Sequence, residues 1–288
     1  MDILIIGLLL GGTYALMAMG LQLQYGVARI MNLANGEILI AGAFSTFWFY
    51  SATKASPLFA LFLVAPAAFV LNWAIYRILI YPLVRRAKSQ GKLEVDSILA
   101  TFGISFIAVG ILLAIFGGQY LDYSYLSQPI FIFGERYGLN RVVAFLASVL
   151  LCTALYVWLH KTRAGLALRA VSVNPSASGL VAINVAQTSA LAFALGGAVT
   201  AVGGGLLSMF LTFDVSLGVV FTLKALVIVI LGGVGDIRGT ILAAFILGLA
   251  ETAVATLIDP GLTLAAAYVL FMLVLLIRPE GLLGRRTA

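Results

Sequence analysis

Long apolar runs separated by short polar segments make up the pattern of this chain. The runs cover residues 3–24, 36–52, 58–80, 97–118, 141–159, 188–212, 219–232, 239–257 and 261–277. Most approach the ~20 residues that a helix needs to cross about 30 Å of hydrocarbon, and the alternating segments of a membrane β-barrel are absent. The pattern therefore predicts an all-α polytopic membrane protein of about eight to nine membrane helices. We expect a single domain over residues 1–288.

The composition excludes a water-soluble globule. Hydrophobic residues make up 62% of the chain and charged residues 10%, and the mean hydropathy is +1.13. Too little polar surface remains to cover a core in water. The first run follows only Met1 and Asp2, so it lacks the basic segment of a cleavable signal peptide. We expect it to be a retained membrane span.

One cysteine, Cys152, and one histidine, His160, limit the chemistry available to this chain. A disulfide within the chain is impossible, and neither a multi-histidine metal site nor a convincing nucleophile–base pair can be assembled. We therefore expect no catalytic residue and no metal ligand, which makes an intramembrane enzyme an unsupported alternative.

Basic residues predict which loops face the cytoplasm, because cytoplasmic loops are rich in Lys and Arg. They concentrate in two loops, in the C-terminal tail and at two matching membrane edges: Arg77, Arg85, Arg86, Lys88, Lys92, Lys161, Arg163, Arg169, Arg285, Arg286, Arg29 and Arg278. This assignment puts the N-terminus outside and the C-terminus in the cytoplasm. The net charge of +6 then follows from basic loops that face an anionic leaflet, and nucleic-acid binding is not needed to explain it.

The runs 219–232 and 239–257 differ from the others, because the first is short for a full span and the two meet at the glycine-rich LGGVGDIRGT of residues 231–240. We predict a broken or re-entrant pair, and two full spans are the alternative. Broken backbone is tolerated in a bilayer only where protein or water satisfies its polar groups. The turn is therefore expected to face a pathway or a partner subunit.

The ionisable residues deepest in apolar surroundings are Glu37, Asp236, Arg238 and Glu251. An uncompensated charge at a bilayer centre costs at least about 3 kcal/mol, so each is expected to face protein or water and is a candidate for a translocation pathway. Asp236 and Arg238 can pair across their turn. Glu37 can either stabilise a helix N-terminus or line the pathway, whereas Glu251 has no sequence-local partner and is the better pathway candidate.

Polar and small residues complete this set of candidates. Asn32 and Asn35 precede Glu37 in a predicted bend, where either can cap a helix start, and we include both in the pathway. Lys224 is expected to extend outward to the membrane surface. Two ridges of small residues at helical spacing predict either close packing or a seam along the pathway: Gly197, Ala201 and Gly205, and beside them Gly196, Thr200 and Gly204.

The cytoplasmic segment of residues 161–187 is far longer than two antiparallel helices need for their connection. Its RAGLALRAV stretch predicts one short helix. Asn174 is then a good N-cap, and Pro175 a good first residue, for a second short helix that extends through Ala182. Such helices can form a handle for a cytoplasmic partner, and an interfacial helix lying on lipid is the alternative.

Four motifs in order resemble the branched-chain amino-acid type of ABC importer permeases, LivH branch. They are GGTYALMAMGLQLQYGVARIMNLANGE, TRAGLALRAVSVNPSASGLVAIN, LKALVIVILGGVGDIRGTILAAFILGLAE and IRPEGLLG, and the resemblance spans nearly the whole chain. Two residues depart from the family pattern. Asn35 stands where the family often has histidine, which removes any proton-linked role there. Ala182 stands where the second motif usually has glycine, so the second short helix is expected to end differently.

The resemblance implies the transmembrane domain of an ABC importer in the bacterial inner membrane. The implied partners are a second homologous permease or a second copy of this chain, two cytoplasmic ATPase subunits and an external substrate-binding protein. ATP and magnesium would be used by the ATPases, and this chain, which lacks any Walker motif, would bind no cofactor. The residues implied in coupling to the ATPases are Arg163, Arg169, Asn174, Pro175, Ala177, Leu180 and Asn184.

The function implied by the resemblance is ATP-driven import of branched-chain or other hydrophobic amino acids by alternating access. Related importers that carry urea, short amides or aromatic acids are the alternative within the class. An ion-coupled secondary transporter is the alternative outside it, with Asp236 and Glu251 as residues that could hold the coupling ion.

Overall fold

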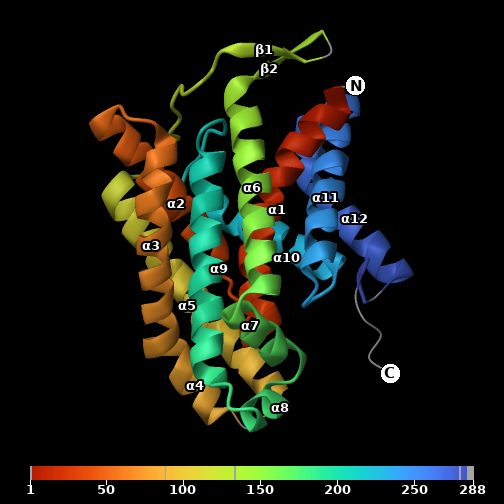
Figure 1. The fold of residues 1–288 in the computed structure, drawn as a ribbon. Helices are drawn as coiled ribbons and strands as arrows, with labels where there is room; N and C mark the ends of the chain where they lie inside the picture. Colours follow the sequence, from red (N-terminus) through yellow and green to blue (C-terminus); the bar gives the residue numbers. More distant parts are fainter. Residues whose placement is uncertain (1, 88, 133, 279, 284–288) are drawn as a thin grey trace.

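The computed structural model describes residues 2–87, 89–132, 134–278 and 280–283 (Figure 1). Its helices are α1 (Asp2–Ala28), α2 (Asn35–Thr53), α3 (Pro57–Ile75), α4 (Tyr81–Arg86), α5 (Gln90–Phe116), α6 (Leu139–Lys161), α7 (Arg163–Val173), α8 (Pro175–Leu180), α9 (Val185–Leu207), α10 (Leu217–Gly232), α11 (Ile237–Leu257) and α12 (Thr263–Ile277). A π-helical segment, Tyr76–Ile80, joins α3 to α4, and a 3₁₀ turn, Pro260–Leu262, precedes α12. Lys88, Arg285 and Arg286 lie outside the described residues.

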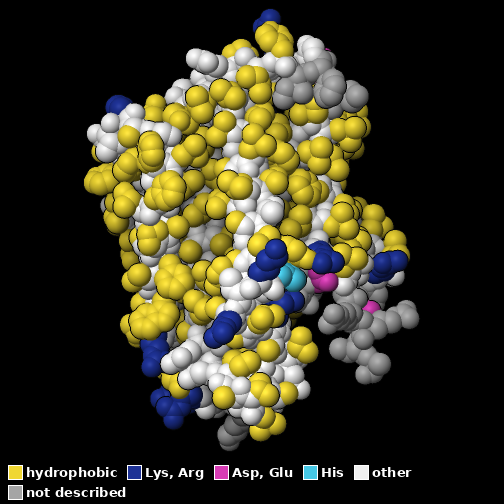
Figure 2. Space-filling view, viewed as in Figure 1, with side chains coloured by type: hydrophobic (Ala, Val, Ile, Leu, Met, Phe, Trp, Pro, Cys, Tyr) yellow, Lys and Arg dark blue, Asp and Glu magenta, His cyan; other side chains and the backbone are white. Residues whose placement is uncertain are grey.

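The predicted all-α membrane class is confirmed. Within the part of the chain that the structure describes, seven helical stretches are long and apolar enough to cross a membrane. They contain α1, α3 with its extension to Arg86, α5, α6, α9, α11 and α12. Hydrophobic side chains cover most of the molecular surface in Figure 2, and the Lys and Arg side chains in that view lie mainly toward the end that carries α7 and α8.

A two-stranded antiparallel hairpin, β1 (Pro129–Ile132) and β2 (Glu135–Gly138), lies at the opposite end of the bundle, which we call the hairpin end. The sequence pattern did not predict it, because four-residue strands are too short to give a clear alternation. Near it, Tyr123 forms a hydrogen bond with Ser208, at 2.9 Å. Burial raises the pKa of Tyr123 to about 12.

Helix α9 occupies the centre of the bundle and packs against α1, α2 and α3. Both of its small-residue ridges are used for this packing. A methyl group added at Gly196 would overlap the Gly20 carbonyl oxygen of α1, and one at Gly204 would overlap the Leu39 carbonyl oxygen of α2. On the other ridge, Gly197 lies against Asn72 of α3. The close-packing interpretation of the ridges therefore holds, since they bring neighbouring backbones together within this chain.

We expect Gly204→Ala to destabilise the fold by about 1–3 kcal/mol, the usual cost of forcing an extra carbon into a packed interior. Gly203→Ala is the matched control on the same helix, because its added methyl would meet atoms no closer than 3.6 Å. There the better helix propensity of alanine is expected to leave stability equal or higher. Thermal unfolding of the purified variants measures both effects, and equal melting temperatures would contradict the tight contact at Gly204.

The helices α2 and α10 begin next to each other in the interior. Gly36, in the first turn of α2, lies so close to Gly218, in the first turn of α10, that a methyl group there would overlap the Gly218 carbonyl oxygen. Thr222 of α10 links the two starts: its hydroxyl accepts the N–H of Gly36 at 2.8 Å and donates to the carbonyl of Leu33 at 3.2 Å. Two chain segments, 29–34 and 208–216, therefore end at one buried junction.

The predicted broken or re-entrant pair corresponds to α10 and α11, joined by residues 233–236, and its depth in the membrane stays a prediction. Helix α11 has 21 residues and can span a membrane, whereas α10 has 16. Two carbonyls at this turn are bonded within the chain: Gln22 of α1 donates to the Gly233 carbonyl at 3.3 Å, and the N–H of Leu282 donates to the Leu231 carbonyl at 2.8 Å. Val234 and Gly235 of the turn are exposed in the single chain, so the expectation that the turn faces a pathway or a partner subunit stays a prediction.

Candidate functional site

The start of α2 is held by residues from other helices. Its N-cap, Ala34, has no capping side chain, so the prediction that Asn32 or Asn35 caps this helix is wrong. Thr222 accepts the Gly36 N–H instead, and Asn32 accepts the N–H of Ala34 itself at 3.0 Å. The cap comes from α10 because the two helix starts share one buried junction.

Asn32 and Asn35 belong to a buried hydrogen-bond network that joins α1, α2 and α9. The Asn32 amide donates to the side-chain oxygen of Gln24 at 2.9 Å, and Gln24 donates to the Phe193 carbonyl at 3.1 Å. The Asn35 side-chain oxygen accepts from the hydroxyl of Thr200 at 3.0 Å. These bonds fix the chain where it turns from α1 into α2.

Glu37 follows this network and is only 1% exposed. One of its carboxylate oxygens, Oε1, accepts a hydrogen bond of 2.8 Å from the hydroxyl of Ser105 in α5. The other, Oε2, is buried and has no hydrogen-bond partner among the described residues. Its place in the first turn of α2 favours a negative charge, because the helix dipole stabilises such a charge by about 0.3–1 kcal/mol at a surface and up to ~2 kcal/mol when partly buried. The dipole does not supply a hydrogen bond to Oε2. This oxygen therefore remains an unused acceptor.

A cleft of about 570 Å³ opens beside Glu37, between α2, α3 and α5. Of the described residues that line it, Glu37 alone is charged. Small residues such as Ala41, Ala60 and Ala67 line much of it, with Trp48 among the larger ones. A cleft with apolar walls and one carboxylate can accommodate a small molecule that is apolar except for a cationic group.

Glu251 lies in a second buried cluster, between α1, α10 and α11. The Lys224 ammonium donates to Glu251 Oε2 and to the Tyr14 hydroxyl, both at 2.8 Å, and the Tyr14 hydroxyl donates to the same carboxylate oxygen at 2.8 Å. Glu251 is 2% exposed and Lys224 is 8% exposed. The prediction that Lys224 extends outward is therefore wrong: its counterion lies on the next helix, and pairing is cheaper than exposing the ammonium to hydrocarbon.

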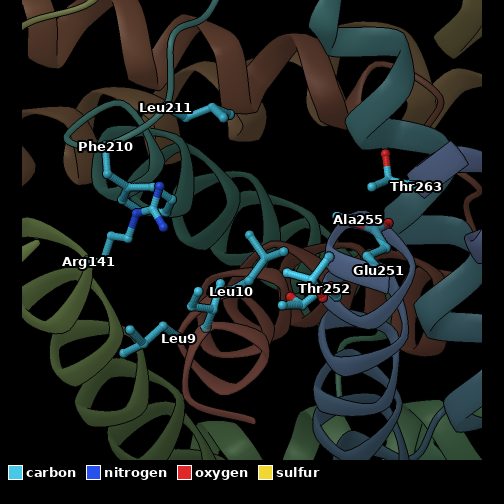
Figure 3. Close-up of a pocket in the computed structure, with 11 residues that line it drawn as sticks. Leu9, Leu10, Arg141, Phe210, Leu211, Glu251, Thr252, Ala255 and Thr263 are labelled. Atoms are coloured by element: carbon cyan, nitrogen blue, oxygen red, sulfur yellow. Dashed lines mark hydrogen bonds between the residues drawn. The ribbon is translucent and has the colours of Figure 1, made fainter. Parts of the chain in front are cut away.

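A smaller cavity of about 260 Å³ lies next to this cluster (Figure 3). It is lined by apolar residues of α1, by Phe210 and Leu211 of the loop after α9, and by Thr252 and Glu251 of α11. Arg141 of α6 lines it as well, and its guanidinium lies over the Phe210 ring, 6.0 Å from the centroid. The charge of Glu251 is already balanced by Lys224, so the cluster stabilises the packing of three helices and the cavity holds no unbalanced carboxylate.

Asp236 and Arg238 lie at the other end of α11 and do not form the predicted pair with each other's side chains. Asp236 is the N-cap of α11 and accepts the backbone N–H of Arg238 at 2.8 Å and that of Gly239 at 3.1 Å. The Arg238 guanidinium donates to the hydroxyl of Tyr156 in α6. Asp236 caps the helix and does not pair with the Arg238 side chain, because its carboxylate directly precedes the first turn of α11 and reaches the free N–H groups there.

The distance between Asp236 and Glu251 bears on the ion-coupled alternative. Asp236 caps the start of α11 and Glu251 lies 15 residues further along it, so at 1.5 Å per residue they are about 22 Å apart along the helix axis. One ion cannot contact both. Asp236 and Glu251 therefore cannot form the coupling-ion site that the secondary-transporter hypothesis required.

The two short helices of the segment 161–187 are confirmed as α7 and α8. Asn174 caps α8 by accepting the Ala177 N–H at 3.0 Å, Pro175 is the first residue of α8, and Asn184 caps α9 by accepting the Gln187 N–H at 3.1 Å. Helix α8 ends at Leu180, before the predicted Ala182, which has a positive φ of 61°. The left-handed position usually filled by glycine is thus retained, with alanine in it.

Helix α7 anchors this segment, and α8 projects from it at the end of the bundle (Figure 1). Leu168 and Val171 of α7 are buried against Leu23 of α1 and Leu159 of α6. Arg163 is exposed and Arg169 is half-buried, whereas Leu180 of α8 is 89% exposed. Ala177 and Val181 are exposed as well. A protruding apolar surface on an anchored helix pair is typical of a docking site.

Comparison with known proteins identifies the family of this chain. The family described as "Branched-chain amino acid transport system / permease component" matches residues 3–278. The chain belongs to this permease family. No solved structure matches the permease significantly.

Curated relatives match the permease over nearly its whole length. The high-affinity branched-chain amino acid transport system permease protein LivH of Salmonella typhimurium is 28% identical, over 97% of this chain and 94% of the relative. BraD of Pseudomonas aeruginosa, with the same description, is 29% identical over 98% and 95%. The probable branched-chain amino acid transport permease protein LivH of Methanocaldococcus jannaschii is 29% identical over 93% and 88%.

Several residues of these sites were not anticipated from the sequence of the permease. Tyr14, Ser105 and Thr222 complete the clusters around Glu251 and Glu37, yet each looks like an ordinary polar residue within an apolar run. The pair Lys224 and Glu251 did carry a signal, because opposite charges on two consecutive membrane helices favour pairing.

Proposed function

We propose that this permease imports branched-chain or other hydrophobic amino acids in a complex driven by ATP. The complex contains a second permease subunit, two ATPase subunits at the end that carries α7 and α8, and an external substrate-binding protein at the hairpin end. That orientation places the α7–α8 end in the cytoplasm of a bacterial cell and agrees with the Lys and Arg side chains gathered toward it. The similarity to LivH and BraD, which are branched-chain amino acid transport system permease proteins, supports the substrate class.

The proposal rests on the helix pair α7 and α8, which forms an anchored, exposed surface that a cytoplasmic partner can contact. Leu180 is 89% exposed on a helix that is capped by Asn174 and anchored through buried α7. Movement of an ATPase against this surface shifts the helices between outward-open and inward-open arrangements, because contacts that differ between two states shift their equilibrium. The permease itself makes and breaks no bond.

The test is uptake of labelled leucine into proteoliposomes that contain the permease, its partner subunits and the binding protein. We expect uptake when ATP is supplied on the side of α7 and α8, and none when an ion gradient is supplied without ATP. Uptake by the permease alone under an ion gradient would instead establish a secondary transporter. Uptake of urea, a short amide or an aromatic acid in place of leucine would keep the importer and change its substrate.

A further inference from the structure

We infer that the Glu37 carboxylate binds the α-ammonium group of the transported amino acid, in the cleft between α2, α3 and α5. This inference rests on the proposed function and deepens it, because it names the group of the permease that meets the substrate. The occupant has a primary ammonium group and an apolar side chain.

The first observation is the unused acceptor of Glu37. Its Oε2 is buried and without a hydrogen-bond partner among the described residues, while Oε1 is held by Ser105 at 2.8 Å. Buried carboxylate oxygens are almost always paired, since an unpaired charge in a medium of low polarity is costly. An ammonium group with three N–H donors supplies both the missing hydrogen bond and the missing charge.

The second observation is the cleft itself. Its volume of about 570 Å³ falls in the range of small-molecule sites, roughly 300–1,000 Å³. Glu37 is the one charged residue among the described residues that line it, and Ala41, Ala60 and Ala67 give it apolar walls. These walls suit an aliphatic side chain, and the single carboxylate favours contact with the ammonium end of a zwitterionic amino acid over contact with its carboxylate end.

The third observation is that the carboxylate is held in place. The backbone before it is fixed by Thr222, and Gly218 of α10 packs so closely that a methyl group there would lie 3.3 Å from the carboxylate carbon. A preorganised group binds its partner without first being ordered. Glu251 also has a buried oxygen, Oε1, without a hydrogen-bond partner among the described residues, but it does not qualify for the same role because Lys224 already neutralises its charge at 2.8 Å.

Protection of an introduced cysteine tests the inference on the complete transporter in lipid nanodiscs. Ala41 lines the cleft one helical turn after Glu37, so Ala41→Cys in a Cys152→Ala background reports occupancy through its rate of maleimide labelling. Ser51→Cys, on the same helix outside the cleft lining, is the control. Leucine and leucinamide are expected to slow labelling at position 41 and not at position 51, whereas isocaproate, which lacks the ammonium group, leaves both rates unchanged.

Glu37→Gln separates the charge from the shape of the side chain. It is expected to weaken protection by leucine about tenfold or more, the effect of losing one hydrogen bond to a charged group, and to lower leucine uptake to a similar degree. Ser105→Ala keeps the carboxylate and is expected to lower uptake much less. Equal protection by isocaproate, no protection by leucine, or native uptake with Glu37→Gln would each overturn the inference. Absence of ATP-driven leucine uptake by the native complex would instead overturn the proposed function.

Discussion

Lys224→Met is expected to destabilise the permease by about 3–5 kcal/mol, the largest loss of stability predicted for this chain. The substitution leaves Glu251, which is 2% exposed, without its counterion, and it removes one hydrogen bond of the Tyr14 hydroxyl. An uncompensated buried charge costs far more than the pair itself contributes. The loss is measured as a lower melting temperature and a lower yield of folded protein in detergent.

Two further variants make this result specific. Lys224→Met combined with Glu251→Gln removes both charges, and we expect it to recover most of the lost stability because a neutral amide still bonds with Tyr14. Lys54→Met removes an exposed lysine at the end of α2 and is expected to change stability by less than about 0.5 kcal/mol. A stable Lys224→Met variant, or a double variant no better than the single one, would contradict the charge-pair explanation.

Ala177→Asp combined with Leu180→Asp is expected to reduce uptake at least about tenfold while the permease still inserts and folds. Both positions are exposed on α8, so the new carboxylates meet water in the isolated permease. At an interface with an ATPase they would lose that water, and each unpaired buried charge costs several kcal/mol, which corresponds to a factor well above ten. Uptake and ATP hydrolysis are measured in parallel in proteoliposomes.

The conservative pair Ala177→Ser with Leu180→Met is the matched control, since it keeps both positions neutral and similar in size. Native uptake is expected for it. For the aspartate pair, continued ATP hydrolysis with little uptake supports the role of α8 in coupling. Native uptake by the aspartate pair would exclude that role and leave α7 and α8 as helices that merely lie beneath the membrane domain.

Sequence alone determined the features that depend on neighbouring residues. The membrane helices follow from runs of about 20 apolar residues, because a helix satisfies its own backbone hydrogen bonds wherever it lies in the bilayer. The cap of α8 follows from Asn174 and Pro175, which act on N–H groups within three residues. The family resemblance was likewise readable from the order of its motifs, and the match over residues 3–278 confirms it.

The tertiary structure decided which polar groups meet across helices. Lys224 is predicted from the sequence to extend outward to the membrane surface, and its pairing with Glu251 on α11 overturns that prediction. The sequence predicts that an asparagine caps the start of α2. In the structure the hydroxyl of Thr222 in α10, 186 residues away in the sequence, accepts the Gly36 N–H instead. Such contacts depend on the rotation and depth of each helix, which are set by close packing at Gly36, Gly204 and Gly218. The apolar pattern determines that a helix forms, and packing determines which of its polar residues find partners and which, like Glu37, keep an open acceptor.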